Sequence, residues 1–221
     1  MDNSPHNTKL QLILAAGEIF AEHGFEGASI RAIAEKAGAN IAAINYHFGS
    51  KENLYKETVL FSHKKRGKIQ DILSQEDPNI LKSRQGVEKI IRKIVQLDFH
   101  SFVSPDRPNW SGRLLLRSFF DSAPPFKELI RDEFLPNFQF LKNLALNANP
   151  TLSDQEAHFW ALSLIGKISV YSFLAEPVLM TYNKENYDPS DIEAAIDHIT
   201  KTLVRELFPP EKNNETRSVN S

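Results

Sequence analysis

The sequence predicts an all-α protein, with a small three-helix unit containing a helix-turn-helix at its N-terminus and a larger helical domain after it. Three observations predict this fold class. Apolar residues recur at spacings of three and four along most of the chain, no segment alternates apolar and polar residues as a half-buried strand does, and capping residues, Gly and Pro separate the periodic segments. The 221 residues, 41% of them hydrophobic, are enough to bury a sizeable core.

The N-terminal unit begins with a predicted helix over residues 8–23, which Gly24 and Gly27 end. Ser29 is placed to cap a second short helix, and Gly38 supplies the backbone freedom that ends it. Both segments therefore predict amphipathic helices with one buried face. In the first helix the apolar stripe consists of Leu12, Ile13, Ala16, Ile19 and Phe20.

A third, shorter helix follows Asn40, which can cap it. Ile44 and Phe48 stand four residues apart on one of its faces, and Gly49 ends it. So short a helix is not stable alone, so neighbours must brace one face while the other is free to meet a partner. Two helices joined by a Gly-containing turn form a helix-turn-helix, whose second helix fits a DNA major groove. An ordinary helical hairpin within a larger bundle is the alternative, and the pattern alone favours neither.

The rest of the chain predicts six more helices, which makes nine in all. A long helix over residues 51–73 links an N-terminal domain at residues 1–50 to a C-terminal domain at residues 74–210. We expect the polar ends at residues 1–7 and 211–221 to be disordered. The other helices are predicted over residues 83–102, over 110–120, over 126–147 with a bend at Pro136, over 153–176 from a Ser153–Glu156 capping box to Pro177, and over 188–208.

Several motifs stand at fixed spacing early in the chain: Phe20-Ala-Glu-His-Gly24-Phe25, Ile33-Ala34, Ala37-Gly38, Ile44-Asn45-Tyr46-His47-Phe48 and Lys51-Glu52-Asn53-Leu54. Together they resemble the N-terminal domain of TetR-family transcriptional regulators, over residues 8–60. The segment from Leu114 to Phe126 and the helix after it are similar to the C-terminal domain of a CerR-like subgroup. The resemblance implies a DNA-binding domain followed by a ligand-binding and dimerisation domain. It implies a cytoplasmic, ligand-responsive repressor that binds a palindromic double-stranded DNA operator as a homodimer and binds no membrane.

Arg31 is the predicted base reader, because a guanidinium at the start of a helix near the groove can donate to both O6 and N7 of guanine. A salt bridge to Glu35, four residues on, is the alternative. Asn45 can pair with adenine, but family members usually carry an aromatic residue there, which leaves a phosphate contact open. Ile41 stands between the core face and the groove end of its helix. With the resemblance, the predicted DNA-binding set is Ser29, Arg31, Asn40, Ile41, Ala42, Ala43, Asn45, Tyr46, His47 and Lys51.

The middle helices are rich in aromatic residues, and two arginines, Arg113 and Arg117, stand four residues apart among them. Because buried cations need partners, we expect these arginines to face a mostly apolar cavity that accepts an acidic or polar aromatic effector. Pairing with Asp121 or Glu128 and a plain aromatic core are the alternatives. The predicted pocket consists of Phe99, His100, Phe102, Trp110, Arg113, Arg117, Phe120, Phe134 and Phe138.

The last two long helices are the predicted dimer surface, because one reading helix covers only a few base pairs and useful specificity requires two copies. A seam inside one chain is the alternative, and the resemblance favours a four-helix dimer interface. The predicted interface consists of Ala161, Leu164, Ile165, Ile168, Ile192, Ile196, Ile199 and Leu203.

Composition and charge limit the classes of function that the chain can have. The chain has no Cys, and it shows no phosphate-binding Gly loop, nucleophile motif or metal-binding His spacing, so we expect no enzyme activity, catalytic residue, metal or cofactor. No apolar run reaches the roughly 18 residues of a membrane span. The net charge is −2, but residues 51–68 carry six basic against two acidic residues, so positive charge follows the helix-turn-helix. A helical protein-interaction scaffold, or a small-molecule-binding protein without DNA readout, is the other candidate class.

Overall fold

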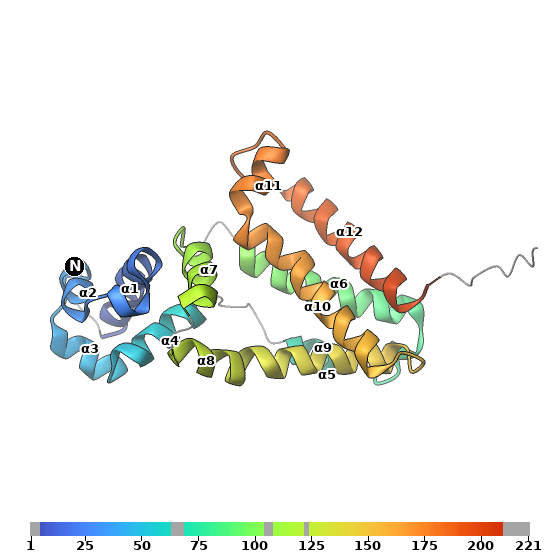
Figure 1. The fold of residues 1–221 in the computed structure, drawn as a ribbon. Helices are drawn as coiled ribbons and strands as arrows, with labels where there is room; N and C mark the ends of the chain where they lie inside the picture. Colours follow the sequence, from blue (N-terminus) through green and yellow to red (C-terminus); the bar gives the residue numbers. More distant parts are fainter. Residues whose placement is uncertain (1–4, 63–68, 104–107, 122–123, 210–221) are drawn as a thin grey trace, which may run out of the picture.

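A computed structural model describes residues 5–62, 69–103, 108–121 and 124–209 of the chain. All regular structure in these ranges is helical, which confirms the all-α prediction. Figure 1 shows α1–α4, α7 and α8 at one end of the molecule and α5, α6 and α9–α12 at the other. Within the described ranges no single helix is long and apolar enough to cross a membrane. The pair α10 and α11, bent by 75° at their junction, has the length and composition of a span only when both helices are taken together.

The four N-terminal helices follow the predicted order. α1 begins at Pro5, so the disorder expected for residues 1–7 is wrong for the last three of them, and residues 1–4 lie outside the described ranges. Gly24 interrupts α1 with a left-handed backbone (φ 73°), after which one more helical turn follows. Their bounds are Pro5–Gly27 for α1, Ile30–Lys36 for α2, Ile41–Phe48 for α3 and Lys51–Ser62 for α4.

The predicted linker helix over residues 51–73 corresponds to α4 and α5 (Ile69–Ser74), and residues 63–68 between them lie outside the described ranges. A short 3₁₀ helix, η1 (Ile80–Lys82), then leads into α6 (Arg84–Val103). The disordered tail expected at residues 211–221 also lies outside the described ranges.

The helix predicted over residues 126–147 is present but divided. It consists of α8 (Pro124–Leu129), a π-helical turn η2 (Ile130–Phe134) and α9 (Leu135–Ala148), and α7 (Ser111–Asp121) precedes it. The widened turn lies directly before Pro136, which has no N–H to donate and whose ring crowds the carbonyl four residues back. The helix is thus irregular one turn before Pro136, whereas the bend predicted at Pro136 itself stays a prediction.

The C-terminal helices are α10 (Asp154–Phe173), α11 (Ala175–Thr181) and α12 (Pro189–Leu207). The prediction that Pro177 ends one long helix is wrong, because Leu174 leaves helical geometry first (φ −116°, ψ 35°). Pro177 then occupies the third position of α11, where a backbone N–H has no partner within the helix. Twelve α-helices in the described ranges replace the predicted nine.

Buried apolar residues form two clusters. The head cluster joins α1–α4 to α7 and α8, so residues 110–129 pack with the N-terminal helices, a division that the predicted domain boundaries do not follow. The body cluster joins α5, α6, α9, α10 and α12. Members of the head cluster include Leu12, Phe20, Ile33, Ile44, Leu54, Tyr55, Trp110, Leu114, Phe126 and Leu129. Members of the body cluster include Ile69, Ile90, Ile94, Phe99, Leu141, Leu144, Trp160, Leu164, Ile196 and Leu203.

Candidate nucleic-acid interface

The turn between α2 and α3 has the geometry that its residues predict. Asn40 caps α3, since its Oδ1 accepts from the Ala43 backbone N–H at 2.8 Å, and Gly38 has a left-handed backbone (φ 63°). Ser29 lies at the N-cap of α2, but its side chain makes no capping hydrogen bond, so that part of the prediction is wrong. Its backbone carbonyl accepts from Ile33 N–H at 3.0 Å instead. Ser29 is exposed at the start of α2.

α3 separates a buried from an exposed face. Ile44 and Phe48 are 0% and 6% exposed and belong to the head cluster, which braces the helix from behind. Tyr46, by contrast, is 82% exposed and Ile41 45%, so Ile41 lies on the solvent side. Of the other predicted residues on this helix, Ala42 and Asn45 are exposed, while Ala43 and His47 are half-buried, Ala43 against the head cluster.

Arg31 is exposed on α2, and the structure places no ion pair between it and Glu35, the partner considered as its alternative. The neighbouring Lys36 pairs with Glu18 of α1 at 2.7 Å, and this hydrogen bond raises the pKa of the lysine. Arg31 therefore differs from Lys36 in keeping its guanidinium available to a partner outside the chain.

Lys51 opens α4 and lies against the end of α1. Its Nζ stands 4.7 Å from the centroid of the Phe25 ring and donates to the Glu26 carbonyl at 3.4 Å. Ser50 caps α4 by accepting from Asn53 N–H at 3.2 Å. The pKa of Glu52 is lowered, first by its backbone N–H and then by the Ser50 hydroxyl, so the positive end of α4 already holds one carboxylate.

The residues predicted as one effector pocket are dispersed over both clusters. Phe99 is buried in the body cluster, whereas Trp110 is buried in the head cluster, because α6 and α7 pack at different ends of the molecule. Phe120 is 79% exposed, Arg113 is exposed, and Arg117 donates to the Glu22 carbonyl of α1 at 2.9 Å. These residues are therefore not brought together in one cluster.

The remaining pocket residues lie apart from these. His100 and Phe134 are exposed, and Phe138 is half-buried against the body cluster. The Phe102 side chain lies outside the described part of the structure. Glu128, considered as a partner for the arginines, pairs with Lys56 of α4 instead.

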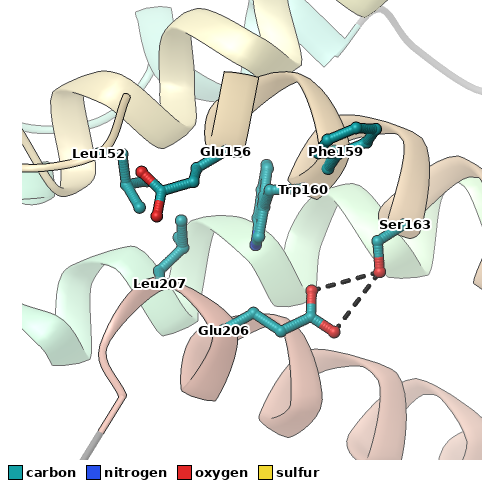
Figure 2. A pocket seen from close by; sticks show the side chains of 7 residues that line it. All are labelled: Leu152, Glu156, Phe159, Trp160, Ser163, Glu206 and Leu207. Carbon is teal, nitrogen blue, oxygen red and sulfur yellow. Dashed lines mark hydrogen bonds between the residues drawn. The ribbon is translucent and has the colours of Figure 1, made fainter. Parts of the chain in front are cut away.

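A hollow of about 370 Å³ lies elsewhere, between α10 and α12, and includes no predicted pocket residue. Figure 2 shows the Ser163 hydroxyl beside the Glu206 carboxylate across this hollow. Glu156 caps its own helix through Ser153, and Glu206 pairs with Lys167 at 2.8 Å, so both carboxylates already have partners. The lining consists of Leu152, Glu156, Phe159, Trp160, Ser163, Glu206 and Leu207.

The predicted dimer residues face inward. Six of them are at most 2% exposed and fill the body cluster, the arrangement that the alternative of a seam within one chain describes: Ala161, Leu164, Ile168, Ile196, Ile199 and Leu203. The other two, Ile165 and Ile192, are half-buried against the same cluster. The opposite face of α10 carries exposed Phe159, Leu162 and Val170, which sequence reasoning missed because α10 is apolar on both sides.

Sequence reasoning also missed the contacts that hold α7 against the four N-terminal helices α1–α4, here called the head. Trp110 packs against Gly17 of α1 so closely that a Cβ added to Gly17 would lie 2.2 Å from the indole ring. The hydroxyls of Tyr55 and Ser118 are hydrogen-bonded at 2.6 Å in the buried space between α4 and α7. A glycine in the middle of an apolar helix stripe was the available signal for the close approach at Gly17.

Comparisons with known proteins agree with this architecture. Residues 12–58 match the sequence model of the N-terminal region of bacterial regulatory proteins of the TetR family. Residues 87–207, more than half of the chain, match the C-terminal domain of the HTH-type transcriptional dual regulator CecR, the subgroup expected from the sequence as CerR-like.

Among curated relatives, the transcriptional repressor AcnR of Corynebacterium glutamicum is 27% identical over 126 residues, which is 57% of this chain and 57% of the relative. CecR of Shigella flexneri is 60% identical over 47 residues, 21% of each chain. The matched region thus spans 57% of the AcnR sequence and 21% of the CecR sequence, less than two thirds of either relative.

Solved structures share the fold at low identity. A transcriptional regulator from Rhodococcus sp. Rha1 superposes with a TM-score of 0.58 and 19% identity, covering 92% of this chain and 97% of that one. The hemolysin II regulator HlyIIR gives a TM-score of 0.51 at 22% identity, covering 89% and 99%. Together with the matches over residues 12–58 and 87–207, this establishes that the chain belongs to the TetR family of bacterial regulatory proteins, in the subgroup with a CecR-type C-terminal domain.

Proposed function

We propose that the protein is a transcriptional repressor of the bacterial cytoplasm that binds a palindromic operator as a homodimer and is released by a small-molecule effector. The observation that carries this proposal is α3, a short helix braced from behind by Ile44 and Phe48 whose other face is exposed. A helix of this kind, set after a Gly-containing turn, has the form of a major-groove reader.

The exposed side chains suit a DNA duplex in size and chemistry. Ala42 is small enough to let the α3 backbone approach the bases and contact thymine methyl groups. Arg31 is free of its neighbour Glu35 and matches the O6 and N7 acceptors of guanine. We assign phosphate contacts, which position the domain, to Ser29, Tyr46, His47 and Lys51.

A selection from random duplexes followed by mobility shifts tests DNA readout. We expect an enriched palindrome whose binding weakens linearly as the logarithm of the salt concentration rises. Replacing Arg31 should relax one base position in each half-site, whereas replacing Arg205, an exposed arginine on α12, should change nothing. A protein that enriches no sequence, or that selects the same sequence without Arg31, contradicts the assignment.

The proposed dimer surface is the outward stripe of α10, formed by Phe159, Leu162, Gly166 and Val170, here called the α10 stripe. Its three large apolar residues are 58%, 43% and 36% exposed, in the order of the chain. Gly166 is exposed, and a Cβ added to it would meet no atom within 4 Å. A glycine costs about 1 kcal/mol more than alanine inside a helix, and among the described residues no close contact at Gly166 requires it. A second copy crossing closely at Gly166 would offset it, in a two-fold arrangement that repeats each contact.

Sedimentation velocity tests the dimer directly, with a single dimeric species expected at micromolar concentration. A monomer that nonetheless binds the full palindrome with high affinity would contradict it.

Effector response is proposed as a population shift: the effector binds a conformation in which the two heads are wrongly spaced for the operator. The two tryptophans offer a reporter in each cluster, Trp110 in the head cluster and Trp160 in the body cluster, where its Nε1 donates to Leu203 at 3.0 Å. Single-tryptophan variants, Trp110→Phe and Trp160→Phe, can be titrated with acidic and aromatic small molecules. Compounds that release the operator should change the fluorescence of at least one variant, and a compound that releases it without changing either would contradict the proposal.

A further inference from the structure

We infer that the π-helical turn Ile130–Phe134 is a hinge. The four N-terminal helices α1–α4, together with α7 and α8, form a head unit that turns on this hinge against the body, which consists of α5, α6 and α9–α12. This inference rests on the proposed function, because the turning would set the spacing of the two heads on DNA. Two observations carry the inference: the contacts that hold the helices on each side of the turn, and the exposure of residues 131–136, which follow the half-buried Ile130.

On one side, α7 and α8 are fixed to the head. Trp110 fills the space beside Gly17, leaving no room for even a methyl group there. The hydrogen bond between Tyr55 and Ser118 is buried, and Lys56 of α4 pairs with Glu128 of α8. Arg117 adds a bond from α7 to the end of α1. These contacts join α7 to both α1 and α4 and join α8 to α4, so we expect α7 and α8 to move with α1 and α4.

On the other side, α9 is fixed to the body. Leu141, Leu144 and Ala145 are at most 2% exposed in the body cluster. Gln70 of α5 donates to the Asn137 side chain at 3.0 Å, and Lys142 pairs with Asp154 of α10 at 2.5 Å. The start of α9 is therefore held by α5 and α10, and of these two helices α10 also contacts the head cluster, through Phe173 at its end.

Between these two sides, α8, the π-helical turn and α9 continue as one helical rod along the lower edge of the molecule in Figure 1. Residues 131–136 are all exposed, and Phe134 stacks on Phe138 of the same rod with ring centroids 6.2 Å apart. This stretch is therefore less buried than the helices on either side. The Leu135 N–H donates five residues back, to Ile130, and the Asn137 side chain bonds the Glu133 carbonyl at 2.8 Å. A wide, solvated turn next to a proline bends at lower cost than the packed helices beside it.

The head unit and the body also meet where Phe119 of α7 lies against Phe173 of α10, edge to face with centroids 5.6 Å apart. Such an aromatic contact has no fixed partner atoms and can be remade as the rings slide. A rotation at the hinge would thus change the position of the head without breaking the hydrogen bonds on either side.

Paired spin labels test the hinge, since the chain has no Cys and each introduced cysteine is labelled uniquely. The pair across the hinge is Lys127→Cys with His198→Cys, and the control pairs are Gln11→Cys with Lys127→Cys in the head unit and Gln85→Cys with His198→Cys in the body. All four positions are exposed. Labelled chains are diluted into excess unlabelled protein, so that only distances within one chain are measured. On adding a selected duplex, we expect the cross-hinge distance to shift by at least about 2 Å, the scale of helix shifts in switching proteins, while both control distances stay fixed.

A proline variant tests the hinge without DNA. Pro136→Ala restores the missing N–H and should convert the turn to regular helix, shifting the cross-hinge distance in the free protein and changing operator affinity at least about fivefold. The matched control is Pro189→Ala, at the first position of α12, which should alter neither. The inference is overturned if Pro136→Ala leaves the cross-hinge distance unchanged, or if DNA moves the head-unit pair as much as the cross-hinge pair. If no duplex binds at all, the proposed function fails, and the distances in free Pro136→Ala still decide the hinge.

Discussion

α3 and α10 both bury one face and expose the other, but their exposed faces differ in chemistry. The exposed side of α3 carries Asn45 and Tyr46 beside small alanines, whereas that of α10 carries Phe159, Leu162 and Val170. A face of small and polar groups suits a hydrated, charged groove, while an apolar stripe suits another protein surface that excludes water. The difference supports the two proposals that α3 contacts DNA and that a second copy of the chain packs on α10.

The largest effect is expected from a charge on the α10 stripe. Leu162→Glu should give a monomer, because the carboxylate would lose its hydration in the interface, and operator affinity should fall by about 10²–10⁴ as the second head is lost. Sedimentation velocity and mobility shifts measure the two effects. Met180→Glu, at a 70% exposed position on α11, is the control and should stay dimeric. Unchanged dimerisation of Leu162→Glu would remove α10 from the interface.

Neighbouring residues of α3 sharpen the contrast between its faces. Ile44→Ala should lower the free energy of unfolding by about 2–5 kcal/mol, since Ile44 is fully buried in the head cluster. Asn45→Ala should change it by no more than about 0.5 kcal/mol and affect DNA binding instead. Urea unfolding followed through Trp110 fluorescence measures both. Equal destabilisation by the two substitutions would show that Asn45 is packed inside the protein.

The predicted base reader gives a smaller effect confined to DNA. Arg31→Ala should cost about 1–3 kcal/mol of binding free energy on the selected operator and relax one base position, with unfolding unchanged. Arg31→Lys separates readout from charge, since an ammonium keeps the charge without the two-pronged donor geometry. If the lysine variant retains full base preference, Arg31 contacts phosphate and not guanine.

Local signals in the sequence predicted local structure well. The cap at Asn40, the left-handed Gly38 and the Ser153–Glu156 capping box are all present, because each depends on a few adjacent residues. The two faces of α3 were also predictable, since only Ile44 and Phe48 give that helix a buried side.

Helix phase and helix partners were not predictable in the body. α10 is apolar all round, so periodicity could not decide which stripe faces the core, and the inner residues Leu164 and Ile168 were taken for the outer ones. The dispersal of the predicted pocket residues has a related reason. Phe99 and Trp110 are close in sequence, yet they pack into different clusters, a tertiary choice that single-sequence patterns do not encode.

The smallest effect is expected from the pH dependence of a helix cap, and it distinguishes the cap of α3 from the cap of α12. Asn40 caps α3 without charge, whereas the Asp188 carboxylate caps α12, accepting from Asp191 N–H at 3.0 Å and from Lys184 at 2.6 Å. Lys184 foremost, then Ser190 and the backbone, lower the pKa of Asp188 below its ordinary 3.8. A carboxyl whose pKa is lowered by folding stabilises the folded state above its unfolded pKa, and this contribution is lost as the pH falls below that value.

Acidification from about pH 5 to pH 3 and below should therefore loosen the start of α12 but leave the cap of α3 unaffected. Amide chemical shifts of Ser190, whose N–H donates to Asp188 Oδ1 at 2.9 Å, and of Ala43, followed by NMR, report the two caps. Asp188→Asn keeps the capping geometry, because asparagine caps as well as aspartate, and should remove the part of the Ser190 response that comes from the Asp188 carboxyl. If the part removed has a midpoint at or above the ordinary aspartate value, the ion-paired cap is contradicted, and an equal response at Ala43 would show that the whole fold unfolds in acid.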